Sequence, residues 1–312
     1  MTAYVVHPWN VTPLPYAAVM STNPAEPLLI EEQAAFRRPG RALIGWLTAD
    51  RGAITLAGAN PSGAHDEKLI ARVTAAQAAV AARPPGVDQE AMIDDTHPAL
   101  EAVGQRLSQQ PDAAPFWAEG WTLAVVDLAR VCSLQQAVAS QQAEERVKGI
   151  DPDDLTSIAE VTLPRPSLTP LPTQFDEHRR AWIVTAANPN LTIAGQFSGE
   201  VQPGVIGFGF AVAVRPSFLQ VARHHGRLVL RDGYHRAYGL LTRGVTHAPV
   251  FIRDFGVGEL GTAPGLFGTD IYLGERPPRL PDFLDNEVAA SVDVPAVQKM
   301  IIVQGMELTP LA

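Results

Sequence analysis

Residues 228–241 read LVLRDGYHRAYGLL, and this stretch decides the fold. The apolar run before Asp232 is typical of a buried strand, and Gly233 favours a tight turn directly after it. Apolar residues then recur at helical spacing, and a glycine, Gly244, follows as a stop signal. The recurring positions are Ala237, Leu240 and Leu241. The stretch therefore predicts a strand, a glycine turn and a short helix.

The flanking sequence extends this unit in both directions. Residues 218–223 and 227–231 surround His224-His225-Gly226, a pattern that predicts a β-hairpin with an exposed polar turn. Residues 248–253, APVFIR, predict a return strand, and the apolar residues 207–214 predict a buried strand that precedes the hairpin. Residues 201–253 should thus form a small α/β unit.

The turn itself favours anion binding. Asp232 is expected to cap the helix by accepting from the amides of Tyr234 or His235, and Gly233 lets the backbone approach a ligand closely. Free N–H groups and the helix dipole favour an anion at that end. Arg236 adds a guanidinium suited to phosphate. The predicted phosphate-binding residues are Gly233, Tyr234, His235 and Arg236.

The run from Asp232 to Val250 resembles the "dGxxRxxA…G…vPv" pattern of the ParB N-terminal and sulfiredoxin superfamily. The match covers 208–253 and extends weakly back to about residue 120 through the V-D-L of 126–128. The resemblance implies an α+β domain with a mixed sheet and flanking helices. It also implies a nucleotide ligand, ATP, ADP or CTP with Mg²⁺, bound at the glycine turn.

Departures from the family narrow the function. Tyr234 stands where sulfiredoxin has its reactive cysteine, so sulfinic-acid reduction is not expected. The 59 residues after Arg253 are rich in glycine and proline, which argues against the DNA-binding domain of ParB proteins. A kinase-like reaction needs a base, and the catalytic candidates are His235, Glu200 and Asp232. No paired-carboxylate metal motif is recognisable.

Charge is unevenly distributed along the chain. Residues 201–253 hold seven arginines and one acid, a net charge of +6, whereas the remainder holds 17 basic and 32 acidic residues, a net of −15. A basic island in an acidic protein indicates a bound anion rather than a polyanion surface, so nucleic acid is not an expected partner. The supporting basic residues are Arg231, Arg227 and Arg215.

Outside this unit the sequence predicts a three-part organisation. It consists of an N-terminal α/β extension (1–115), a ParB/sulfiredoxin-like domain (116–255) and a C-terminal arm that packs on the core (256–312). A hairpin is expected over 41–57. Further helices are expected over 66–83, from Pro98 to Leu107 with Thr96 as the cap, and over 134–147; further strands are expected at 121–127, 180–185, 191–194 and 299–304.

The amino-acid composition limits both the cellular compartment that we expect and the disulfide and metal chemistry that the chain can support. A single cysteine, Cys132, offers no internal disulfide and no structural zinc site. The N-terminus lacks a signal-peptide pattern and no apolar run has the length of a membrane span, so a cytoplasmic protein is predicted.

The leading functional hypothesis is a nucleotide-binding enzyme, a hydrolase or phosphotransferase, in which Arg236 and His235 hold the phosphates. The alternative is a non-catalytic module that senses a nucleotide or another phosphorylated small molecule and contacts a protein partner. A nucleic-acid binder or nuclease ranks third, because the remainder of the chain is strongly acidic.

Overall fold

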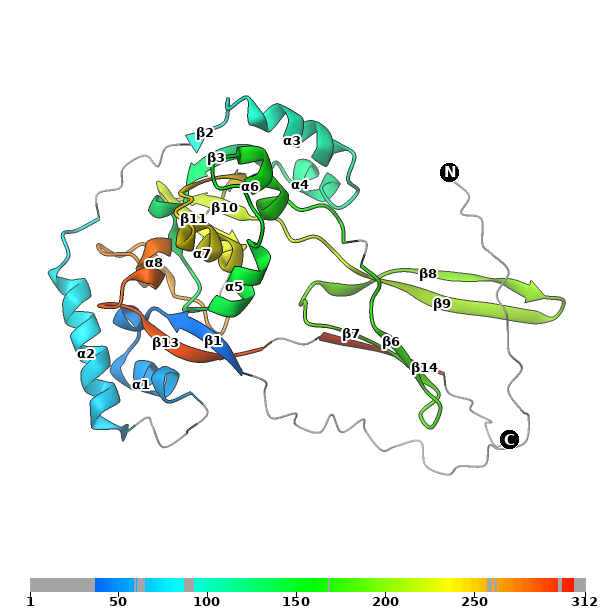
Figure 1. The fold of residues 1–312 in the computed structure, drawn as a ribbon, viewed down its shortest axis with the longest axis horizontal. Coiled ribbons are helices and arrows are strands. Elements are labelled where there is room, and N and C mark those ends of the chain that lie inside the picture. Colours follow the sequence, from blue (N-terminus) through cyan, green and yellow to red (C-terminus); the bar gives the residue numbers. More distant parts are fainter. Residues whose placement is uncertain are drawn as a thin grey trace. The chain divides into compact units, whose positions relative to one another are not determined.

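The computed structural model describes residues 37–58, 60, 65–86, 93–167, 169–256, 260, 263–296 and 299–305. This part of the chain combines helices with both parallel and antiparallel strand pairs, so the predicted α+β class is confirmed (Figure 1). Residues 1–36 of the predicted N-terminal extension lie outside the described residues.

A mixed sheet at the centre of the fold has the strand order β2-β3-β12-β10-β11-β4. Its strands are β2 (Ile93–Asp94), β3 (Thr122–Asp127), β4 (Cys132–Ser133), β10 (Gln220–His224), β11 (Arg227–Asp232) and β12 (His247–Asp254). β10 runs antiparallel to β11 and parallel to β12, and β3 runs antiparallel to β12. The predicted hairpin 218–231 is confirmed, with His225 and Gly226 at φ 49° and 75° in its turn.

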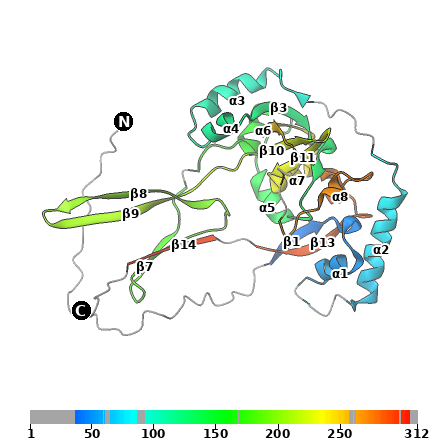
Figure 2. The same ribbon diagram turned by 180° about the vertical axis from the view of Figure 1, so that it is seen from behind.

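Helix α7 (Tyr234–Thr242) carries the chain from β11 to β12 and is buried along most of its length. It packs against α5 (Ser140–Arg146) and α6 (Leu155–Thr162), and the two views of the fold agree on its position beside α5 (Figures 1 and 2). Gly239 makes the close approach possible, because a Cβ there would lie 2.7 Å from the carbonyl oxygen of Ala143. The other helical elements of this part of the chain are α3 (Ala99–Ser108), α4 (Ala114–Ala118) and η3 (Leu128–Arg130).

A second sheet joins segments that are distant in the sequence. It has the order β13-β1-β5, from β13 (Ala290–Pro295), β1 (Arg37–Ala42) and β5 (Ala137–Ala139). α1 (Ala49–Ala57) packs against β13 of this sheet and also contacts α2 (Glu67–Ala82) and η1 (Ile44–Trp46). Two short elements follow later in the chain, α8 (Thr269–Tyr272) and η4 (Leu280–Leu284), and η4 packs against α7. Asp66 caps α2 by accepting from the amides of Lys68 and Leu69 at 2.8 and 3.4 Å, and this confirms the helix predicted over 66–83.

Two further β structures complete the described chain. One has the order β14-β7-β6, from β6 (Thr173–Asp176), β7 (Ala181–Ala186) and β14 (Lys299–Gln304). The other is a long two-stranded hairpin of β8 (Leu191–Gln202) and β9 (Val205–Val214). The strands predicted at 180–185 and 299–304 are confirmed, and the strand predicted at 191–194 is the start of β8.

Several sequence-based predictions are wrong. Residues 49–57 form α1 rather than the second strand of a hairpin, because Thr48 caps a helix there by accepting from the amide of Arg51. The helix predicted over 134–147 is confined to α5, since β5 pairs with β1 before it. The helix predicted from Pro98 is confirmed, but its cap is not Thr96, whose own amide donates to Asp94.

Residues 207–214 provide the largest correction. They lie in β9 and are exposed or half-buried rather than buried, because β8 is their hydrogen-bonded neighbour and the central sheet is not. His224, predicted to lie in an exposed turn, is buried with its Nδ1 3.1 Å from the carbonyl oxygen of Phe255.

Among the described residues, the helices are all too short or too polar to cross a membrane.

Candidate functional site

The strand-to-helix turn predicted to bind phosphate lies at the end of β11. Asp232 accepts there from the Gly233 amide at 2.6 Å and from the Ser217 hydroxyl at 2.8 Å. It does not cap the amides of Tyr234 or His235 as predicted, and the helix N-cap is Gly233 itself. Gly233 has φ 98°, and a Cβ there would lie 2.9 Å from Cγ of Leu219. The glycine therefore serves tight packing of the turn on the chain before β10.

Tyr234 and Arg236 both point into the protein. The Tyr234 hydroxyl accepts from the Leu134 amide at 3.0 Å and donates to the carbonyl of Leu230, and burial raises its pKa. Arg236 is 3 % exposed. Its guanidinium donates to the Ser217 hydroxyl at 2.7 Å and to three carbonyl oxygens, those of Ser217, Val161 and Thr162.

Arg236 thus satisfies carbonyl groups at the C-terminal end of α6 and in the segment before β10. Burial lowers its pKa to about 10, so the guanidinium stays charged at neutral pH. A charged group this deeply buried must be hydrogen-bonded, and here the protein's own oxygens supply the acceptors. In this structure the arginine is an internal tie between two helices and a loop.

His235 is the predicted phosphate-binding side chain that remains half-exposed. Burial, followed by the charges of Arg146 and Arg236, lowers its pKa to about 4, so the imidazole is neutral at pH 7. Arg146, on α5, is also half-buried, and Asp232 opposes the lowering of its pKa by burial. This end of α7 therefore gathers two guanidinium groups and a neutral histidine around one carboxylate.

The supporting basic residues do not join this turn. Arg231 lies over the rings of Trp121 and Phe255, at 5.6 and 5.1 Å from their centroids. Arg215 forms an ion pair of 3.7 Å with Asp112. Glu200, a candidate base, is exposed on β8 and accepts from the Gly204 amide at 3.3 Å. The arginine island of the sequence is dispersed in the fold.

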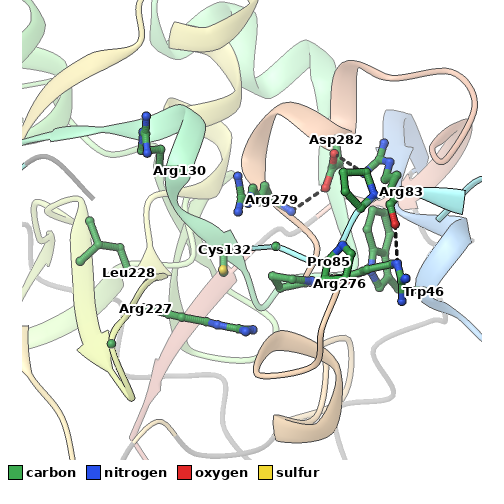
Figure 3. Close-up of a pocket in the computed structure, with 14 residues that line it drawn as sticks. Trp46, Arg83, Pro85, Arg130, Cys132, Arg227, Leu228, Arg276, Arg279 and Asp282 are labelled. Atoms are coloured by element: carbon green, nitrogen blue, oxygen red, sulfur yellow. Dashed lines mark hydrogen bonds and ion pairs between the residues drawn. The ribbon is translucent and has the colours of Figure 1, made fainter. Parts of the chain in front are cut away.

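A cavity of about 400 Å³ lies at the opposite end of β11, where Gly226, Arg227 and Leu228 contribute to its wall (Figure 3). β11 has six residues, so the cavity and the glycine turn are roughly 15–20 Å apart along the strand. Among the described residues, five arginines line the cavity against one carboxylate, Asp282. The arginines are Arg83, Arg130, Arg227, Arg276 and Arg279.

Some of these arginines are bound by the protein itself. Arg83 pairs with Asp282 and Asp285 at 2.8 and 2.7 Å, and its guanidinium lies over the ring of Trp46. Arg227 donates to the carbonyls of Tyr272 and Gly274 at 2.7 and 2.8 Å. Both side chains are fixed in position by these contacts, which is the preorganisation that an anion site needs.

Arg279 differs from the other arginines of the cavity in the hydrogen bonding of its guanidinium group. Within the described residues its guanidinium donates no hydrogen bond, although its charge lowers the pKa of Asp282 against the stronger effect of burial, which raises it. The remaining wall is apolar or aromatic, from Trp46, the prolines and Leu228. The cavity therefore offers one uncommitted guanidinium beside fixed positive charge and an apolar surface, the mixture that small-molecule sites show.

Sequence reasoning missed this cavity because four of its five arginines lie outside the basic island. The overlooked signal is a repeated Arg-Pro-Pro, at 83–85 and at 276–278. The two segments meet in space: the Gly86 amide donates to the Glu275 carbonyl at 2.7 Å, and Arg276 Nε donates to the Arg83 carbonyl at 2.6 Å. That contact brings the arginines of both segments to one opening.

Comparisons with protein-family models, with curated proteins and with solved structures each returned no match. Within the described residues, groups of three or more His, Cys, Asp or Glu side chains placed to hold a metal ion are absent.

Proposed function

We propose that this protein binds a phosphorylated small molecule, with nucleotides as the first class to test, in the cavity lined by Arg83, Arg227 and Arg279. The observation that carries the proposal is the convergence of five arginines on a cavity of about 400 Å³ with a single lining carboxylate. Guanidinium forks match phosphate oxygens in geometry and charge. The volume falls in the range of small-molecule pockets.

The order of hairpin, glycine turn, helix and return strand supports a ParB/sulfiredoxin-like relationship for residues 218–254, and that superfamily supplies the nucleotide as ligand class. The glycine turn is the less suitable anion site in this structure, because Arg236 is already bonded to four protein oxygens. The two ends of β11 thus divide the roles: the turn holds the fold together and the arginine cavity holds the ligand.

Binding without chemistry fits the cavity best. Asp282 is the one carboxylate among the described lining residues; it accepts from Arg83 at 2.8 Å and from the Arg279 amide at 2.7 Å, and burial raises its pKa. An acid held by two donors is poorly placed to take a proton from an attacking water. We therefore favour the ligand-sensing module over the hydrolase or phosphotransferase.

The test is calorimetric titration of the full chain with ATP, ADP, CTP, GTP, pyrophosphate and inorganic phosphate, with and without Mg²⁺. Arg279→Ala should weaken binding by roughly 10- to 100-fold, the value of one charged hydrogen-bonding partner. Arg165→Ala removes an exposed arginine outside the cavity and is the matched control. Equal affinity in the wild type and Arg279→Ala would contradict the site, and phosphate release from ATP at a steady rate would contradict the non-catalytic role.

A further inference from the structure

The hairpin of β8 and β9 exposes an unusual amount of apolar side chain. In β9, Ile206 is 72 % exposed, Phe208 79 % and Phe210 44 %, and in β8, Ile193 is 49 % exposed. Between residues 191 and 214 the sequence carries one charged residue, Glu200. A two-stranded hairpin alone is marginally stable in water, and an exposed patch of this size marks an interaction surface.

The register of the hairpin places these four side chains on one face. Ile206, Phe208 and Phe210 alternate along β9 and therefore point to the same side, and Ile193 is the cross-strand partner of Val212 on that side. The β8 partners of the three β9 residues are polar, namely Glu200, Ser198 and Gln196. We call this side, with Ile193, Ile206, Phe208 and Phe210, the apolar face.

On the opposite face two large side chains of β8 pack over glycines of β9, although Phe197 and Val201 remain 52 % and 46 % exposed. Phe197 lies over Gly209, where a Cβ would come within 2.6 Å of its ring. Val201 lies over Gly207 in the same way, since a Cβ there would be 2.6 Å from a methyl group of the valine. Glycines on one strand thus accept the large side chains of the other. The apolar face instead sets its large β9 side chains beside polar β8 residues, and within the described residues β8 and β9 hydrogen-bond as strands only with each other.

We propose that the apolar face is a self-association surface and that its occupant is the same face of a second copy of this chain. An apolar row from β9 flanked by a polar row from β8 is the arrangement of an interface core with a hydrophilic rim. A two-fold axis near Phe208 brings the β9 rows of both copies together and leaves both Glu200 carboxylates at the rim. Such an isologous contact closes as a dimer.

The area is consistent with this occupant. The four apolar side chains together expose about 450 Å² per copy, if a large side chain offers roughly 180 Å². Two copies would bury about 900 Å² of apolar surface, and the polar row would bring the total towards the roughly 1,200 Å² at which stable interfaces begin. The hairpin contains no lysine or arginine, so it lacks the positive charge that draws surfaces to anionic lipid or nucleic acid.

Sedimentation velocity of the full chain over a range of concentrations tests the proposal. The wild type should form a dimer, and the double variant Ile206→Ser with Phe208→Ser should raise the dimer dissociation constant by at least about 100-fold. Both side chains are exposed, so the variant should fold. Ile54→Ser, at a 48 % exposed isoleucine on α1, is the matched control and should dimerise as the wild type does.

Three outcomes would overturn the proposal: a wild type that stays monomeric, a dimer that survives the double substitution, or a dimer lost equally in the control. Co-sedimentation of a monomer with phosphatidylcholine–phosphatidylglycerol vesicles, abolished by the double variant, would assign the face to a lipid surface instead. Nucleotide titration of the double variant separates this surface from the arginine cavity, because its affinity should equal that of the wild type.

Discussion

Replacing Arg236 with alanine should destabilise the protein rather than simply remove a ligand contact. Arg236 is 3 % exposed, and its guanidinium donates to the Ser217 hydroxyl and to the carbonyl oxygens of Ser217, Val161 and Thr162. Alanine would leave three carbonyl groups without this donor, at the end of α6 and before β10. It would also leave a cavity of side-chain size in the layer between helices.

The magnitude follows from those contacts. A hydrogen bond to a charged group contributes about 1.5–3 kcal/mol, and two of the contacts, at 3.4 and 3.5 Å, are long. The two short contacts alone correspond to about 3–6 kcal/mol, and we take about 3–5 kcal/mol, the usual cost of breaking a buried charged network. For a chain of this size each kcal/mol lowers the melting temperature by about 2–4 °C, so a decrease of roughly 6–20 °C is expected.

Urea unfolding and thermal melting of the wild type, Arg236→Ala and Arg236→Lys measure this loss. Lysine keeps the charge without the planar fork, so its stability should lie between the other two. Arg279→Ala, at the uncommitted arginine of the cavity, should melt within about 2 °C of the wild type. An Arg236→Ala protein with unchanged stability and abolished nucleotide binding would refute this reasoning and return the phosphate site to the glycine turn.

The turn supports two further predictions. Because the pKa of His235 is lowered to about 4 from an unfolded value of 6.5, the unfolded state binds the extra proton between these limits, and stability falls as the pH falls through this window. Between pH 7 and pH 5 the wild type should lose about 2 kcal/mol more than His235→Gln, as measured by urea unfolding at both pH values, and equal losses would contradict the shift. Gly233→Ala should cost about 2–4 kcal/mol, since the residue has φ 98° and its Cβ would approach Leu219 Cγ to 2.9 Å; a melting temperature within about 2 °C of the wild type would contradict this strain.

The sequence predicted the centre of the fold well because its signals there are local. Gly226 and Gly244 adopt positive φ values of 75° and 78°, which end the hairpin turn and the helix where their positions indicate. The apolar spacing of Ala237, Leu240 and Leu241 corresponds to a buried helix face. Each of these features depends on a few neighbouring residues, so no tertiary knowledge was needed.

The wrong predictions share one physical origin. An apolar sequence pattern shows which residues are hydrophobic, but it does not show which part of the chain packs against them. Residues 207–214 have the composition of a central strand, yet Gly207 and Gly209 are there to receive Val201 and Phe197 across a hairpin. Residues 49–57 contain an apolar run that suits either state, and the capping contact from Thr48 decides for helix. The deciding partners are two side chains across the hairpin in the first case and one capping hydroxyl in the second, and only the folded chain reveals these roles.

The arginines show the same difference between sequence and space. In 201–253 they lie close in sequence but leave the chain in different directions, because strand residues alternate between faces and α7 turns its own arginine inward. The cavity instead collects arginines from segments nearly 200 residues apart, where Arg276 Nε donates to the Arg83 carbonyl and the Gly86 amide donates to the Glu275 carbonyl. Proline after each arginine favours extended backbone, so both segments can run past each other and present their side chains to one side. The position of the proposed anion site is therefore set by the contact between these two extended segments, which brings their arginines together at the cavity.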